Sequence, residues 1–509
     1  MGGGNLLYSL RAMSEHPGAP VVLDPDQAGT TWSIADLAER ADLLSASYLA
    51  RDVRPGDRVA VYVDDNFDYF LHAQALGQIG AIGVMMNSNL AAAPASRLLQ
   101  RTAPVGIVTS ESRLARLEGS ATASTRWHTP AVELSHGVIG LGDRVRHEPS
   151  DPVMIVHSSG TTGSPKAVVH THASSFAGAR SRLRTFDETP GDLVLAVQPN
   201  SHVGALMYFA YLLAAGARFV PQGDVHGSSL PELIRRLRPT TVMGFAHVYA
   251  ELATERPAPG TLDPVTAWIS MGDSLHDGHV QSVLRGCTAP QAAVYDRFGA
   301  SEFGWGILLQ RRGRNAVAAP RAVGRPDATV DAAVLRRDGT HAEVGEVGLF
   351  GARSPSLTSG YWDDPEFTEQ FMLSEYWLSG DLARVDDDGV FYHLDRAADS
   401  GWEQCIPFRS VEYEELAINA LPDQVADVTM ILSEQKVIAF VVANDPDVLA
   451  EALRLAISEL GEAGGQPAVD EVRLVASDEL PTGATGKVLK NRLREQLVHS
   501  ISNGGGDRS

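Results

Sequence analysis

A stretch of small and hydroxyl-bearing residues, 158 to 167, follows a short apolar run and carries a single lysine, Lys166. Closely spaced small residues let backbone N–H groups and hydroxyls surround an anion, and the lysine adds a point charge. The stretch therefore predicts a phosphate-binding loop. It is not the common phosphate loop, in which glycine directly precedes the lysine, because Pro165 precedes Lys166 and Ala167 follows it.

Four later segments also combine glycine with polar or charged residues. They are QPNSHVG at 198–204, YDRFGASE at 295–302, YWLSGD at 376–381 with Asp395-Arg396 after it, and LPTGATGK at 480–487. Taken singly, each pattern is also typical of an ordinary turn, a satisfied core histidine or a solvated surface lysine.

Alternating helical and extended patterns must position these segments. Residues 34–50 read as a helix with Ser33 as N-cap, and strands are expected at 58–63 and 82–86 around a helical stretch at 67–80. This rhythm predicts an α/β fold with largely parallel, doubly wound mixed sheets. From residue 323 to 389 short strands with Gly/Asp turns predict a small β-barrel-like unit. A small α+β unit is expected after Asp395.

Composition narrows the possible functions. The chain has 509 residues and a formal charge of −21, from 42 basic and 63 acidic side chains, which argues against nucleic-acid or anionic-membrane partners. Its two cysteines form no disulfide framework, and the N-terminus lacks a signal-peptide pattern, so a cytoplasmic location is expected. The longest apolar stretch, 205–217, is too short to span a bilayer and predicts a buried helix.

The five segments, in this order, resemble the adenylate-forming superfamily, which includes acyl-CoA synthetases, peptide-synthetase adenylation domains and firefly luciferases. The resemblance covers about residues 31 to 495. It implies that ATP and a carboxylic acid give an acyl-adenylate and pyrophosphate, with acyl transfer to a thiol following. It also implies an N-terminal domain, 1–394, whose β-rich part is 323–394. A mobile α+β domain, 395–509, would turn about a hinge at Asp395.

The resemblance assigns roles to individual residues. The implied ATP- and AMP-binding set is Ser159, Gly160, Thr161, Thr162, Gly163, Lys166, Gly272, Asp273, Ser274, Asp296, Arg297, Phe298, Gly299, Ser301, Asp381 and Arg396. The implied catalytic residues are Lys487, Glu302 and His202, with Glu302 also holding Mg²⁺. The implied acid pocket consists of His202, Val203, His247, Gly272 and Ala300.

Two positions depart from the family's pattern. Ala167 stands where glycine is usual. If that glycine used a positive φ, alanine would cost roughly 1 kcal/mol or more; if it only gave clearance, the extra methyl group could push the loop off the phosphates. After the hinge, Ala397-Ala398 replaces a lysine pair, and Gln404-Cys405 falls at a usual glycine pair beside the thiol tunnel. A catalytic Cys405 is disfavoured because no base lies at a readable spacing.

The sequence thus predicts a carboxylic acid–CoA ligase that uses ATP, Mg²⁺ and CoA as a monomer or homodimer. Its acid is expected not to be an amino acid and to be apolar and bulky. Three alternatives stay open: an enzyme with weak adenylation that thioesterifies a preformed adenylate, a ligase that loads a carrier-protein thiol, and a non-catalytic acyl- or nucleotide-binding protein. A kinase or ordinary phosphate-loop NTPase is disfavoured by the missing Gly-Lys pair.

Overall fold

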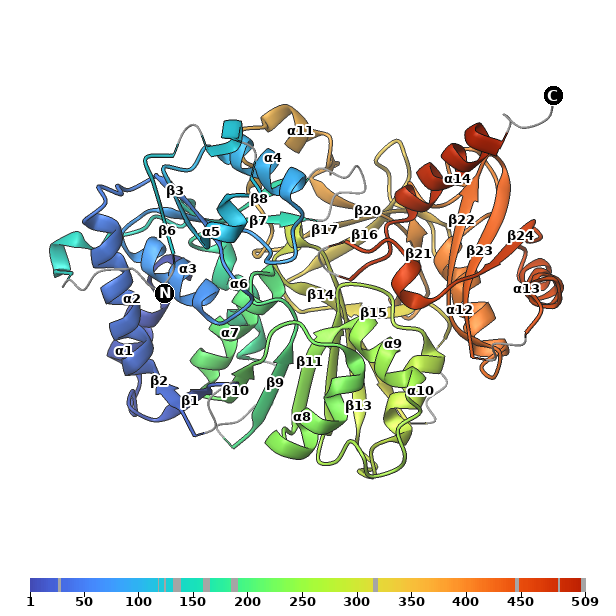
Figure 1. The fold of residues 1–509 in the computed structure, drawn as a ribbon, viewed down its shortest axis with the longest axis horizontal. Coiled ribbons are helices and arrows are strands. Elements are labelled where there is room, and N and C mark those ends of the chain that lie inside the picture. Colours follow the sequence, from blue (N-terminus) through green and yellow to red (C-terminus); the bar gives the residue numbers. More distant parts are fainter. Residues whose placement is uncertain are drawn as a thin grey trace.

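A computed structural model describes residues 1–509 except 26–28, 118, 123–124, 131–138, 159–164, 185–190, 315–318, 445–447, 484–485 and 505–509. Three sheets organise these residues (Figure 1). No helix in the described ranges combines the length and the apolar character needed to cross a lipid bilayer.

The largest sheet has a parallel half and an antiparallel half. Its strands, in spatial order, are β16 (Asp331–Leu335), β17 (Gly348–Arg353), β20 (Tyr376–Val385), β21 (Phe391–Arg396), β15 (Ala322–Pro326), β14 (Gly306–Gly313), β13 (Ala293–Gly299), β12 (Ala267–Met271), β11 (Thr241–Phe245), β9 (Leu193–Val197), β10 (Arg218–Pro221), β1 (Pro20–Leu23) and β2 (Thr31–Ser33), with β19 (Met372–Leu373) beside β20. Strands β1 and β9 to β13 pair in parallel. The antiparallel unit predicted from residue 323 is continuous with this sheet through the pairing of β14 with β15.

The second sheet carries the start of the phosphate loop. It consists of β18 (Gly360–Tyr361), β8 (Lys166–Thr171), β7 (Pro152–Ser158), β4 (Ile82–Met85), β3 (Arg58–Tyr62), β5 (Gly106–Thr109) and β6 (Trp127–Thr129). The third consists of β22 (Val425–Ser433), β23 (Lys436–Ala443) and β24 (Glu471–Leu474). It lies at one end of the molecule, on the right in Figure 1.

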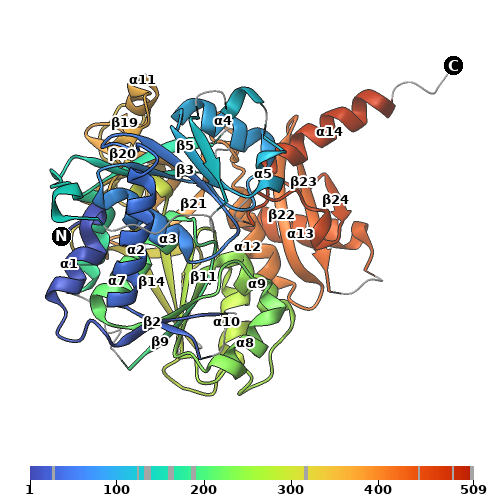
Figure 2. The same cartoon turned by 60° about the vertical axis from the view of Figure 1, so that its left-hand side comes forward.

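Helices cover the sheets as the doubly wound pattern predicts (Figures 1 and 2). They are α1 (Leu6–Met13), α2 (Ile34–Leu49), α3 (Asp68–Gln78), α4 (Ala92–Thr102), α5 (Glu111–Leu114), α6 (Ser174–Arg182), α7 (Val203–Ala215), α8 (Leu230–Leu237), α9 (Ala246–Thr254), α10 (Asp277–Arg285), α11 (Pro365–Glu369), α12 (Ser410–Ala420), α13 (Ala450–Ala463) and α14 (Lys490–Gly504). Short 3₁₀ turns include Ser301–Phe303.

Two helices illustrate why the sequence folds in this way. The N-cap Ser33 of α2 accepts a hydrogen bond from Asp36 N at 3.2 Å, while the Asp36 carboxylate accepts one from Ser33 N at 2.8 Å. This reciprocal cap satisfies backbone donors at the helix start, as predicted. Helix α7 is buried on nearly all sides and packs in the core formed between the two large sheets. Its end at Gly216, where φ is +68°, uses the left-handed conformation that glycine adopts without strain.

Candidate active site

Two adjacent cavities of about 430 and 150 Å³ lie where the parallel strands of the large sheet end. Met271 of β12 pairs in register with Arg297 of β13, so the residues after both strands reach the same edge. Ligands of open α/β sheets commonly bind at such carboxyl ends. The cavities share a wall that consists of Gly272, Asp273, Arg297, Gly299, Arg396 and Lys487.

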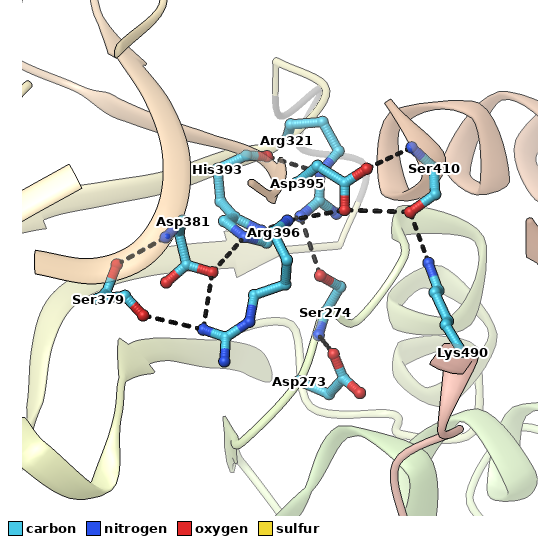
Figure 3. A network of polar contacts seen from close by, with 10 residues as sticks. All are labelled: Asp273, Ser274, Arg321, Ser379, Asp381, His393, Asp395, Arg396, Ser410 and Lys490. Carbon is cyan, nitrogen blue, oxygen red and sulfur yellow. Dashed lines mark hydrogen bonds and ion pairs between the residues drawn. The ribbon is translucent and has the colours of Figure 1, made fainter. Parts of the chain in front are cut away.

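Asp381 is a buried acceptor on the larger cavity (Figure 3). Arg396 Nη1 lies 3.2 Å from Asp381 Oδ1, and His393 Nε2 lies at the same distance from that atom. Burial alone would raise the pKa of Asp381, but the charge of Arg396 and the hydrogen bond from His393 hold it well below its usual range. A permanently ionised carboxylate of this kind can accept hydrogen bonds from two neighbouring hydroxyls.

Other walls of the larger cavity combine an aromatic face with a polar network. Phe298 makes an edge contact with Phe350, with ring centroids 5.0 Å apart, and it also contacts His393 at 5.4 Å. Arg321 donates to Ser274 Oγ and to the His393 carbonyl, both at 3.0 Å (Figure 3). The arrangement offers a flat apolar surface beside hydrogen-bonding groups, which suits a purine nucleoside.

Two predicted acids on this cavity have different ionisation. Asp273 is held ionised, because the charge of Lys487 overcomes burial and lowers the pKa of its carboxyl. Asp296 pairs with Arg312, yet burial dominates and raises the pKa of Asp296. Asp296 thus serves mainly as an internal partner on the cavity floor.

The smaller cavity brings Lys166 and Glu302 together. Lys166 Nζ lies 4.1 Å from the Phe371 ring centroid and 5.5 Å from that of Tyr361. Burial lowers the pKa of Lys166, although the nearby charge of Glu302 opposes this. Tyr361 donates its hydroxyl to Glu302 Oε1 at 2.8 Å. The described residues contain no cluster of three or more metal-ligating side chains. Glu302 nevertheless fits the single-carboxylate role, because Mg²⁺ takes one or two carboxylates together with phosphate oxygens.

His202 lies at the N-terminus of α7 and lines the smaller cavity. Its Nδ1 accepts a hydrogen bond from Gly204 N at 3.1 Å, and its ring stands edge-on to Phe245 with centroids 4.8 Å apart. Burial, with help from His157 and Lys487, lowers the pKa of His202 to about 3. The imidazole is therefore neutral at physiological pH.

Lys487 reaches the shared wall from a small hairpin. Thr482 pairs with Val488, and Gly483 N donates to the Lys487 carbonyl at 2.8 Å. Gly486 has φ of +75°, and a Cβ there would lie 2.6 Å from the His247 ring. Only glycine allows so close an approach.

Most predicted site residues meet at these cavities. Lining residues are Lys166, His202, Val203, His247, Gly272, Asp273, Ser274, Asp296, Arg297, Phe298, Gly299, Ala300, Ser301, Glu302, Asp381, Asp395, Arg396 and Lys487. The predicted residues Ser159 to Gly163 lie outside the described ranges. Sequence reasoning missed Tyr361, Arg321, His393 and Glu415, which come from segments without a recognisable motif. Of these four, only His393 had a signal in the sequence, because it lies two residues before the predicted hinge at Asp395.

Asp395, the predicted hinge residue, is fully buried. Its carboxylate accepts hydrogen bonds from the backbone N–H and the hydroxyl of Ser410, and Lys490 donates to the same hydroxyl (Figure 3). Lys490 also donates to Glu414 Oε1 at 2.8 Å. These contacts connect β21 to α12 and to the start of α14.

The structure overturns the argument about Ala167. This residue lies in β8, paired with His157 of β7, and it is absent from the described residues with positive φ. Its methyl group is fully buried in a core cluster with Ile155 and Val169. The prediction treated residue 167 as part of the loop, but the strand already begins at Lys166. Alanine here costs no backbone strain, and the reason for a weakened phosphate grip at this position disappears.

Ala167→Gly is therefore expected to destabilise the protein by about 1 kcal/mol. Glycine loses more backbone entropy than alanine when a strand folds, and the substitution also removes a buried methyl group. Acid-dependent ATP–pyrophosphate exchange should not rise. Urea unfolding and the exchange assay measure the two effects. A clear gain in exchange rate would restore the original argument.

Comparison with known proteins decides the family. Residues 10–362 match the model of the AMP-binding enzyme family. This chain belongs to the AMP-binding enzyme family. A 3-aminoavenalumate diazotase from a Streptomyces species is 30% identical, covering 98% of this chain and 96% of the other. A long-chain-fatty-acid–CoA ligase, FadD13 of Mycobacterium tuberculosis, is 27% identical, covering 91% and 92%.

Among solved structures, an anthranilate CoA ligase, AuaEII, in complex with anthranoyl-AMP has a TM-score of 0.84 at 19% identity, covering 99% of this chain and 98% of that one. This likeness confirms the α/β fold predicted for the AMP-binding enzyme. The family match also confirms the predicted resemblance to adenylate-forming enzymes.

Proposed function

We propose that this AMP-binding enzyme joins a compact carboxylic acid to ATP, giving an acyl-adenylate and pyrophosphate, and then transfers the acyl group to the thiol of CoA. One observation carries the proposal. Lys487 lines the larger and the smaller cavity at once, so its ammonium group stands between a nucleotide site and an acid site. A cation in that position can neutralise charge on both reacting groups.

In this proposal the larger cavity takes the nucleoside. Asp381 accepts the ribose hydroxyls, Phe298 contacts adenine, and Arg396 lies beside the sugar and α-phosphate. Lys166 and Glu302 act on the phosphate side, where Glu302 would hold Mg²⁺ that supplies further charge neutralisation. These groups position the reactants and stabilise developing charge, which is what phosphoryl and acyl activation chiefly require.

The volume of the smaller cavity limits the size of the acid that it can hold. At about 150 Å³ it lies below the range typical of drug-sized ligand sites. Its walls include Val203, Ile269, Met271 and Trp305. We therefore favour an aryl or short acid over the bulky acid expected from the sequence.

Domain alternation belongs to the same proposal. The division into residues 1–394 and 395–509, with Asp395 as hinge, is supported by the separate sheet β22–β24 and its own core cluster. The described orientation has Lys487 at the cavities. A second orientation would withdraw it and admit the thiol.

A second candidate is ATP-dependent diazotisation of an aminoaryl acid, favoured by the diazotase relative that matches almost the whole chain. Nitrite is, like a carboxylate, a small oxyanion. Its oxygen would attack the α-phosphate with loss of pyrophosphate, and the arylamine nitrogen would then attack the nitrosyl nitrogen with loss of AMP. Proton transfer and loss of water from the N-nitroso product give the diazonium ion.

One experiment separates the candidates. Purified protein is incubated with ATP, Mg²⁺ and a panel of compact acids, with pyrophosphate and CoA thioester measured separately. Parallel reactions contain aminoaryl acids with nitrite, and diazonium is trapped as an azo dye. Thioester without dye supports the ligase, and nitrite-dependent dye with pyrophosphate supports diazotisation. ATP binding without pyrophosphate from any mixture contradicts both candidates and favours a binding protein.

A further inference from the structure

Arg297 is an unusual side chain for the wall of an acid cavity. It lies near the end of β13, is 8% exposed and belongs to the wall that the two cavities share. Its aliphatic part lies against Gly306, where an added Cβ would stand 2.7 Å from Arg297 Cβ and 3.0 Å from its Cδ. The glycine makes room for the arginine side chain to run along the cavity wall.

Only one edge of the Arg297 guanidinium is used within the protein. Nη1 donates to the Gly306 carbonyl at 3.1 Å and to Asp327 Oδ2 at 2.9 Å. Among the described residues no partner is present for Nε or Nη2, which carry three of the five N–H donors of an arginine. Neither atom is among the fully enclosed polar atoms that lack a partner. This second edge therefore stays accessible from the cavity.

The electrostatic setting favours an anion at this edge. Burial lowers the pKa of Arg297, and the charge of the nearby Arg182 acts in the same direction. Asp327 opposes both, but it meets the opposite side of the guanidinium. Lys166, Arg396 and Lys487 also line the smaller cavity, although the whole chain carries a charge of −21. A planar guanidinium edge pairs best with a carboxylate, through two parallel hydrogen bonds.

We propose that Arg297 determines specificity by binding a carboxylate of the substrate other than the group that reacts. The inference rests on the proposed function and narrows it to substrates with two functional ends. In the ligase the partner is the second carboxylate of an aryl dicarboxylic acid. In diazotisation it is the carboxylate of an aminoaryl acid whose amine faces the reaction centre.

Matched substrates test this role in the ligase. Terephthalate and 4-carbamoylbenzoate share size and shape, but only terephthalate carries a remote charge. The intact enzyme should use terephthalate with a kcat/KM for pyrophosphate exchange about 10- to 100-fold higher. In Arg297→Met this ratio should fall to near one, and Arg297→Lys should restore part of it. Arg311→Met, which removes an exposed guanidinium from the neighbouring β14, should keep the wild-type ratio.

A purely structural role for Arg297 predicts a different result. Both acids would then lose activity equally in Arg297→Met, with the ratio unchanged, and that outcome overturns the proposal. A wild-type enzyme without preference for terephthalate overturns it as well.

Binding measurements keep this test separate from that of the proposed function. Calorimetric titration of the enzyme with the same two acids needs no turnover. Tighter binding of terephthalate that is lost in Arg297→Met supports the role of Arg297, even where no exchange occurs and the ligase function fails. Equal binding of both acids overturns it. In the diazotisation assay with nitrite, 3-aminobenzoate should give more azo dye than 3-aminobenzamide. This difference should disappear in Arg297→Met.

Discussion

Replacing Lys487 with alanine is expected to lower acid-dependent ATP–pyrophosphate exchange by about 100- to 1000-fold, the usual cost of removing one oriented charge-stabilising donor. The reason lies in its place on the wall shared by both cavities, where it can meet the acid and the α-phosphate together. Isotope exchange, measured with the best acid from the panel, gives the effect. The loss should lie mainly in kcat, because the contact is strongest in the transition state.

The second half-reaction provides the internal control for Lys487. Synthetic acyl-adenylate and CoA should give thioester at a rate close to that of the intact enzyme, since the role proposed for Lys487 ends once the adenylate has formed. Lys436→Ala, which removes an exposed lysine from β23, should affect neither step. Equal losses in both half-reactions would argue against the assigned role.

Glu415→Gln should lower the free energy of unfolding by about 3 kcal/mol near neutral pH, as expected when a buried ion pair loses one partner. Glu415 of α12 is 4% exposed, and its Oε2 lies 3.0 Å from Arg321 Nη1 and 3.8 Å from His276 Nδ1. The variant leaves the buried Arg321 without its carboxylate partner. Chemical denaturation measures the loss, and Glu459→Gln, at an exposed position of α13, is the matched control.

The ionised Glu415 also predicts how the free energy of unfolding depends on pH. Burial opposes ionisation, yet His276 and Arg321 together lower the pKa of Glu415 to about 2. Because the folded pKa lies below the unfolded one, the contribution is complete above about pH 4.5 and is lost as pH falls towards 2. Below pH 4.5, the contribution of Glu415 to the free energy of unfolding of the intact protein should fall by about 1.4 kcal/mol per pH unit. Glu415→Gln should lack that component; identical acid profiles would contradict the assignment.

The sequence predicted residues that lie within strands or directly after them. Gly272, Phe298 and Asp381 stand in short motifs whose order along the chain fixes their place. Arg321, His393 and Glu415 could not be predicted, because they meet through the pairing of β15 with β21 and the docking of α12, which are contacts between distant segments. No local pattern records such contacts.

The error at Ala167 has a different physical origin. The direction of a strand side chain depends on where the strand begins, since successive residues face opposite sides. Composition suggested a loop through residue 167, whereas pairing with β7 already begins at Lys166. A shift of one residue in the expected boundary turned a core methyl group into an apparent obstacle for phosphate.

The Lys487 hairpin has a consequence for the timing of turnover. Its Gly486 rests against His247, and its lysine lines both cavities. In the proposed function this segment would seat after acid and nucleotide have arrived, and it would lift before the products leave. Firmer seating would then speed bond formation but prolong the time that AMP stays bound. Turnover would be fastest at an intermediate strength of this contact, and variants at Gly486 or His247 should move the enzyme to either side of that optimum.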